Sequence, residues 1–245
     1  MKTTKNKFFL NKEEIITILK RDVKEWNKIR SEMDFFLDID LSDTDLSFMD
    51  LSDVNLRWVN LSGANLRETN LCRADLTGAI LTKADLTKIK AHKAKFRWAD
   101  FRNSILRLAD FTEANLRWTR FDNAKLSGAN FKNAELSGSN FTHAVANNTE
   151  FSKSCIKWGN FSNACADYCD LSETNLKEAI FTNTILVGTN FKKSLLFKAN
   201  FDSADARNTK FNKANLLFAN FHHTNLAGVD ITGARDADLT GSQIS

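Results

Sequence analysis

The stretch "EANLRWTRFDNAKLSGANFKNAELSGSNF", at residues 113–141, has a bulky apolar residue at every fifth position. These residues are Leu116, Phe121, Leu126, Phe131, Leu136 and Phe141. A spacing of five matches neither the 3.6-residue period of an α-helix nor the two-residue period of a β-strand. A short period that is sustained in this way indicates a repeat architecture, in which each unit buries one large side chain.

The same spacing extends over most of the chain. We call the bulky position of each five-residue unit its centre, and from Phe36 to Ile231 there are 40 consecutive units without a slip in register. Leu or Phe occupies 34 of the centres, and the others are Ala91, Ala146, Ile156, Ala166, Ala206 and Ile231. A small residue lies two positions before most centres, and Asn or Asp often lies directly before them. The pattern therefore predicts two positions per unit that face a core and three that face water.

The segment "GANLRETNLCRADLTGAILTKADL", at residues 63–86, resembles the A-(D/N)-L-X-X consensus of the pentapeptide-repeat family, and the resemblance covers about residues 36–234. The resemblance implies an all-β fold, a right-handed quadrilateral β-helix in which one unit forms each side and four units form a coil. The centres and the small residues would then point inward, and the chain would form about ten coils.

The spacing of phenylalanine supports a four-sided coil independently. From Phe101 to Phe161 phenylalanine recurs every ten residues, so a coil of twenty residues predicts two Phe ladders on opposite sides. The side between them carries small residues, as close packing requires; these are Ala146, Ala166 and Ala206. The earlier centres, from Leu41 to Leu86, are leucine on all four sides. We expect a solid interior with no room for a ligand.

Stacked coils leave unpaired backbone groups at their ends, so caps are expected. Residues 1–33 form the predicted N-terminal segment, and residues 11–31 have the pattern of one amphipathic helix with a capping box at Asn11 and Glu14. We expect this helix to cover the first coil, with Trp26 in the core of the cap. The alternative is a helix that binds a partner.

The C-terminal end has a different pattern. Residues 34–245 form the predicted β-helix, whose register breaks near residues 235–237, because Ala237 and Leu239 are three residues out of phase. No helix is predicted after the break, so the last coil is expected to end as an exposed edge. Members of the family often dimerise end to end through this coil, and the resemblance therefore implies a homodimer through the C-terminal coils.

The sequence argues against several classes of function. No catalytic set or phosphate-binding loop stands out, so we expect a non-enzymatic protein without a cofactor. The four cysteines and four histidines lack the spacing of a zinc site, which predicts reduced structural thiols and no metal. The N-terminus has an apolar run of only three residues, and no stretch is long enough to span a membrane, so we expect a cytoplasmic protein.

One side of the predicted coil has unusual outward positions. Four tryptophans differ in number by multiples of twenty and so fall in one column, and each of them follows a basic residue. With the apolar residues that continue the same side, the candidate surface is Arg57, Trp58, Arg97, Trp98, Arg117, Trp118, Lys157, Trp158, Phe197, Leu217 and Phe218. The outward charges of this side are the cations Arg57, Lys95, Arg97, Arg117, Lys157, Lys177 and Lys198 and the anions Asp75, Glu135 and Glu178.

Two interpretations of this column remain open. Aromatic ladders and Arg–Trp stacking stabilise flat sheets, whereas Trp and Arg are also the residues most enriched in binding hot spots. The principal hypothesis is a rigid scaffold that presents a surface to an unknown protein partner. A basic aromatic strip also suits nucleic acid or a membrane surface, but Glu135 and Glu178 interrupt it, so nucleic acid is the weaker prediction.

A further alternative comes from the resemblance. The fluoroquinolone-resistance branch of the family resembles DNA in shape and negative charge and binds DNA gyrase. The net charge of +4 and the Trp/Arg side of this chain disfavour that role. A negative cluster does occur in the first coils, at Asp40, Asp43, Asp45, Asp50 and Asp53.

Overall fold

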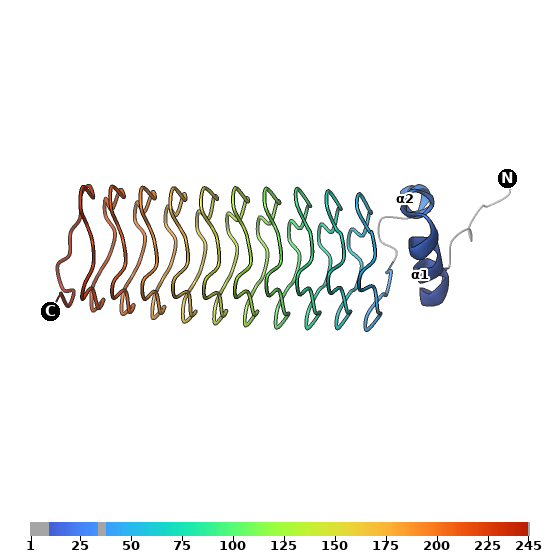
Figure 1. The fold of residues 1–245 in the computed structure, drawn as a ribbon, viewed down its shortest axis with the longest axis horizontal. Coiled ribbons are helices and arrows are strands. Elements are labelled where there is room, and N and C mark those ends of the chain that lie inside the picture. The colour runs from blue at the N-terminus through green and yellow to red at the C-terminus, as the bar shows by residue number, and fades with distance from the viewer. Residues whose placement is uncertain (1–9, 34–37, 245) are drawn as a thin grey trace, which may run out of the picture.

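The structure, a computed structural model, describes residues 10–33 and 38–244, and it is a long rod of stacked coils with two short helices at the N-terminal end (Figure 1). Parallel backbone bridges join residues twenty apart, from Asp40↔Asn60 to Asn215↔Arg235. One coil therefore contains four five-residue units, as the phenylalanine spacing predicts. Phe36, the first predicted centre, lies outside the described residues.

Backbone hydrogen bonds hold each coil to its neighbours. The Asn160 N–H donates to the carbonyl of Ser139, 3.0 Å away, and the Asn160 carbonyl accepts from the Phe141 N–H at 2.6 Å. The side chain of the residue before a centre serves the turn that follows, since Asn160 Oδ1 accepts from the Ser162 N–H at 2.9 Å. The regular Asn and Asp residues thus satisfy local backbone donors, as expected of these residues at turns.

The predicted centres form the core. Every centre from Leu41 to Leu226 is buried. The first Phe ladder is continuous from Phe101 to Phe221, with ring centroids 4.5–5.1 Å apart in successive coils. Rings of the opposite ladder meet it edge to face, as Phe141 and Phe151 do at 5.8 Å. The two ladders thus fill the interior, and the trimmed side with Ala146 is a consequence of their contact.

The N-terminal cap is two helices rather than the single helix predicted for residues 11–31. α1 (Lys12–Arg21) and α2 (Val23–Glu32) are separated by Asp22, whose backbone is extended at φ −158°. The Asp22 side chain accepts a hydrogen bond from the Lys24 N–H at 2.8 Å and so begins α2 as its N-cap. The capping box of α1 is present as predicted, because Asn11 and Glu14 each accept from the backbone N–H of the other.

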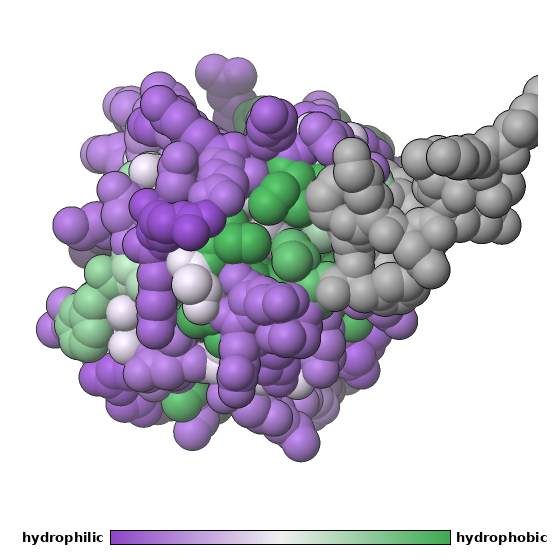
Figure 2. Space-filling model, turned by 90° about the vertical axis from the view of Figure 1, so that its right-hand side faces the viewer, coloured by the Kyte–Doolittle hydropathy of each residue, from purple (hydrophilic) through white to green (hydrophobic). Residues whose placement is uncertain are grey.

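The helices supply hydrogen-bond partners to the first coil, where no earlier coil can. Trp26 is fully buried, and its Nε1 donates to the carbonyl of Asn55 at 2.8 Å. The Asn27 side chain accepts from the Asn55 N–H at 2.8 Å and donates to the Asp53 carbonyl at 2.9 Å. Buried Ile15 and Leu19 of α1 join the hydrophobic core. Apolar residues also gather on the outer surface of this end, surrounded by polar ones (Figure 2).

The C-terminal coil is shortened by two residues. The bridge Asn225↔Gln243 joins residues eighteen apart, where the preceding bridges join residues twenty apart. The bridge Asn215↔Arg235 still joins residues twenty apart, so the two missing residues fall between Arg235 and Leu239. Leu239 then becomes a partly buried centre one coil after Phe221. An open hollow of about 490 Å³ lies beside the shortened stretch and is lined by Phe218, His222, Asp236 and Asp238, among others.

Ile231 is an exception to the predicted core. Its side chain is 38% exposed, although the five-residue register predicts an inward centre. The segment that follows it pairs with residues 223–226 through Gly241 and Gln243. Among the described residues, nothing therefore packs on the C-terminal side of Ile231, and the prediction that it is buried was wrong.

Candidate interaction surface

The four tryptophans of the candidate surface, which we call the Trp column, occupy the corner of the coil two residues after a centre. Their backbone φ angles are 60° at Trp58, 61° at Trp98, 60° at Trp118 and 57° at Trp158. This left-handed region is uncommon for bulky residues and costs a non-glycine residue roughly 1–2 kcal/mol. The four side chains nevertheless remain 39%, 47%, 48% and 51% exposed in chain order. Other residues at this corner, such as Glu113, Asn123 and Lys153, have the same backbone conformation, so the feature that sets the column apart is four partly exposed aromatic residues in one line.

The column consists of two tryptophan pairs, each spanning a glycine. The rings of Trp58 and Trp98 have centroids 6.4 Å apart, and those of Trp118 and Trp158 are 6.5 Å apart and within 10° of parallel. Gly138 lies between the second pair with φ +72°, and a Cβ atom there would overlap the Trp118 ring. Gly78 has the same relation to Trp58. Each glycine thus gives the preceding indole room to lie across the next coil.

Cations lie along the column in three different environments. The Arg97 guanidinium lies 3.9 Å from the centroid of the Trp98 ring, a cation–π contact. Arg117 forms an ion pair with Glu135 at 2.9 Å. Lys157 and Lys177 have no ion pair within the part of the chain that the structure describes. Positive charge on this side is therefore only partly neutralised.

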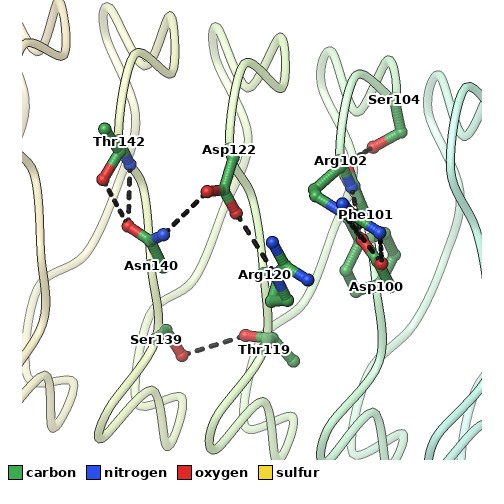
Figure 3. Close-up of polar contacts among 10 residues, drawn as sticks. All are labelled: Asp100, Phe101, Arg102, Ser104, Thr119, Arg120, Asp122, Ser139, Asn140 and Thr142. Atoms are coloured by element: carbon green, nitrogen blue, oxygen red, sulfur yellow. Dashed lines mark hydrogen bonds and ion pairs between the residues drawn. The ribbon is translucent and has the colours of Figure 1, made fainter.

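The adjoining side of the rod neutralises its own charges (Figure 3). Arg102 pairs with Asp100 at 2.6 Å, and Arg120 lies 3.7 Å from Asp122. The same Asp122 accepts a hydrogen bond from the Asn140 side chain at 2.8 Å. Because these charges are paired with one another, they offer a partner less than the Trp column does, although Asp122 Oδ2 is buried and has no hydrogen bond besides its ion pair with Arg120.

The remaining candidate residues form a separate group near the C-terminal end. The rings of Phe197 and Phe218 meet edge to face with centroids 5.7 Å apart, and Phe218 is exposed. Leu217 and Phe218 also line the hollow beside the shortened coil. These three residues therefore lie together, but on coils beyond the last tryptophan.

The structure also exposes an apolar strip that sequence reasoning missed. It lies at one side of the rod and includes Leu108, Val145, Tyr168 and Ile185, all exposed. The available signal was a glycine twenty residues after a bulky corner residue. Gly128 makes room for Leu108 and Gly188 makes room for Tyr168, just as Gly138 does for Trp118.

Other chemistry has little support among the described residues. They contain no group of three or more His, Cys, Asp or Glu residues placed to hold a metal ion. No helix in residues 10–33 or 38–244 is long and apolar enough to cross a membrane. Burial raises the pKa of the Cys169 thiol to about 12, and its Sγ donates to the Ala146 carbonyl. Such a thiol is unreactive near neutral pH.

Comparison with known proteins agrees with the coil geometry. The chain belongs to the pentapeptide-repeat family: the model of the family, pentapeptide repeats, matches in eight copies over residues 55–90, 92–128, 124–163, 160–192 and 199–235. The fold of the family is a right-handed quadrilateral β-helix. No curated protein is significantly similar in sequence.

Two solved structures illustrate the likeness. HetL, a pentapeptide repeat protein involved in heterocyst differentiation regulation from the cyanobacterium Nostoc sp. strain PCC 7120, is 22% identical, with a TM-score of 0.57 over 96% of this chain and 94% of that chain. QnrB1, a plasmid-mediated fluoroquinolone resistance protein, is 17% identical, with a TM-score of 0.48 over 85% of this chain and 92% of that chain. The first likeness supports the fold and carries no function with it.

Proposed function

We propose that this protein is a non-enzymatic scaffold that binds a protein partner through the Trp column and the cations beside it. The observation that carries the proposal is the placement of four half-exposed tryptophans at strained corner positions of one side. Asn, Lys and Glu occupy the same position in many other coils, as Asn123, Lys153 and Glu113 do. The coil therefore does not require tryptophan at this corner.

Recognition accounts for the column better than stabilisation alone. A purely stabilising ladder would place one ring on each coil and bury its faces, as the Phe ladders do. The Trp column instead has glycine in place of a ring at Gly78 and at Gly138, and it leaves 39–51% of each tryptophan exposed. Exposed Trp with neighbouring Arg is the composition of binding hot spots.

We also propose a homodimer through the C-terminal coils. Ile231 and Ile244 are exposed at that end, and no helix covers it among the described residues. An uncovered edge of a parallel β-structure has unpaired backbone groups that favour association. Light scattering that gives the monomer mass at high protein concentration would remove this part of the proposal.

The test of the scaffold role is affinity enrichment from a lysate of source cells. The baits are the wild-type chain, Trp98→Ser/Trp118→Ser, and the control Leu108→Ser/Tyr168→Ser, which changes the same corner position on another side. Loss of one partner from the first variant and its retention by the control would support the proposal. Equal recovery of every protein by all three baits would refute it, and gyrase subunits among them would favour the DNA-mimic alternative.

A further inference from the structure

The second tryptophan pair, Trp118 and Trp158, lies beside Lys157 and Lys177. This part of the surface combines exposed apolar rings with positive charge that has no ion-pair partner among the described residues. The near-parallel indoles of Trp118 and Trp158 span Gly138, and both side chains are about half exposed. Lys157 lies next to Trp158 in sequence, and Lys177 occupies the same position as Lys157 on the following coil.

This pair of lysines differs from several other cations of the rod because, among the described residues, it has no anion as a partner. Several cations on the surface lie opposite an anion one coil away. Examples are Arg73–Asp53 at 2.5 Å, Lys93–Glu113 at 3.4 Å and Lys193–Glu173 at 3.5 Å. Like charges one coil apart also occur at Arg73 and Lys93, but each of these has an anion on its other side, whereas Lys157 and Lys177 have no ion pair within residues 10–33 and 38–244. Like charges at a coil spacing of about 4.8 Å repel each other unless an anion lies between them.

We propose that this part of the surface binds an extended acidic segment of a partner protein. The proposal rests on the scaffold role proposed above and names the chemistry of the partner. A carboxylate placed between Lys157 and Lys177 would relieve their repulsion, and an apolar side chain of the same segment would cover Trp118 and Trp158. The surface spans three coil spacings, roughly 14 Å, which is the length of about four to five extended residues.

Charge also favours a peptide over a nucleic acid. Glu178 follows Lys177 directly, and Glu135 lies near the opposite end of the same surface, paired with Arg117. A nucleic acid carries a phosphate on every nucleotide, so its backbone would meet these carboxylates. An acidic peptide can place neutral residues against them and carboxylates against the lysines.

The experiment measures fluorescence anisotropy of a short labelled peptide in which glutamates flank a Phe-Leu pair. A second peptide with lysine in place of every glutamate is the charge control. The full chain should bind the first peptide and not the second, and binding should weaken as salt is raised, because exposed ion pairs are screened.

Three variants locate the site. Lys157→Glu/Lys177→Glu should weaken peptide binding about tenfold or more, since the carboxylates would then face like charges. Trp118→Ser/Trp158→Ser should weaken it as well. The matched control is Lys132→Glu/Lys192→Glu, which makes the same change in net charge at the same repeat position on an adjoining side of the rod. It should leave affinity within about twofold, because distant surface charges are screened.

Several outcomes would overturn the inference. These are absence of peptide binding, equal weakening by both lysine variants, or displacement of the peptide by single-stranded oligothymidine. If the peptide fails while the lysate experiment still yields a partner that depends on Trp98 and Trp118, only the acidic-segment inference falls. If no such partner appears either, the scaffold proposal falls with it.

Discussion

The Phe ladders inside the rod and the Trp column outside it are both aromatic stacks along the same axis, but they are built differently. Phe141 stacks on Phe121 at 4.8 Å and on Phe161 at 4.5 Å, one ring per coil, and it is fully buried. Trp118 reaches Trp158 only across a glycine coil, at 6.5 Å, and it stays 48% exposed. The inner stack has one ring on every coil and so follows the coil spacing, whereas each pair of the outer stack requires a glycine on the coil between its two rings.

This difference separates the residues that make the fold from those that are available for binding. Removal of an inner ring leaves a cavity that packed neighbours cannot close. Removal of an outer ring exposes a glycine corner to water and relieves a bulky residue from a left-handed backbone. We therefore expect the two columns to differ most in their effect on stability.

The largest effect is expected for Phe141→Ala. The substitution should lower the free energy of unfolding by about 3–5 kcal/mol, because it empties a site where rings of both ladders meet. Chemical denaturation monitored by circular dichroism measures it, and Phe141→Leu, which keeps most of the volume, should lose much less. A loss below about 1 kcal/mol would contradict the inward stack.

Sequence reasoning reached the inner column almost completely, because its period is a property of the backbone. Every fifth residue must point inward when each side of the coil has five residues, and burial of the centres from Leu41 to Leu226 follows. The alignment of the four tryptophans follows from the same arithmetic. The direction in which an indole leans does not, since it depends on whether the next corner is glycine, as at Gly138.

The ends of the rod were less predictable, because there the repeat no longer constrains the chain. The apolar pattern of residues 11–31 continues past Asp22, so the pattern does not show that Asp22 is extended and begins α2 by accepting a hydrogen bond from the Lys24 N–H. The register break was visible in the phase of Leu239. The pairing of the last coil at Asn225 decides which stretch is two residues shorter. The same pairing leaves Ile231 exposed, and neither result could be inferred from the repeat.

The second prediction compares the two members of one tryptophan pair. Trp118→Ser should cost about 1–2 kcal/mol, because it removes both the stacking with Trp158 and the packing on Gly138. Trp158→Ser removes the stacking without a glycine contact, since Glu178 follows it one coil later, and should cost about half as much. Parallel urea titrations measure the difference. Equal losses would mean that the glycine contributes nothing to the pair.

A smaller effect is expected for Gly138→Ala. An Ala side chain at φ +72° is strained by about 1 kcal/mol and would also displace the Trp118 ring. The expected signature is a modest fall in stability together with a red shift of tryptophan emission. Gly233→Ala is the matched control, because a Cβ atom there lies in ordinary contact with Lys213 and near no ring. A red shift in the control as well would mean that the shift does not come from the contact between the glycine and the indole ring.

The smallest effect on stability is expected for Lys157→Glu/Lys177→Glu. Neither lysine has an ion pair among the described residues, so the change removes no attractive contact and exchanges one like-charge pair for another. The free energy of unfolding should therefore change by less than about 0.5 kcal/mol, while binding of an acidic peptide is lost. A variant that is distinctly more stable or less stable would mean that the lysines belong to the scaffold. An unchanged midpoint with lost binding would place them, unlike Phe141, among the residues that the rod presents rather than those that build it.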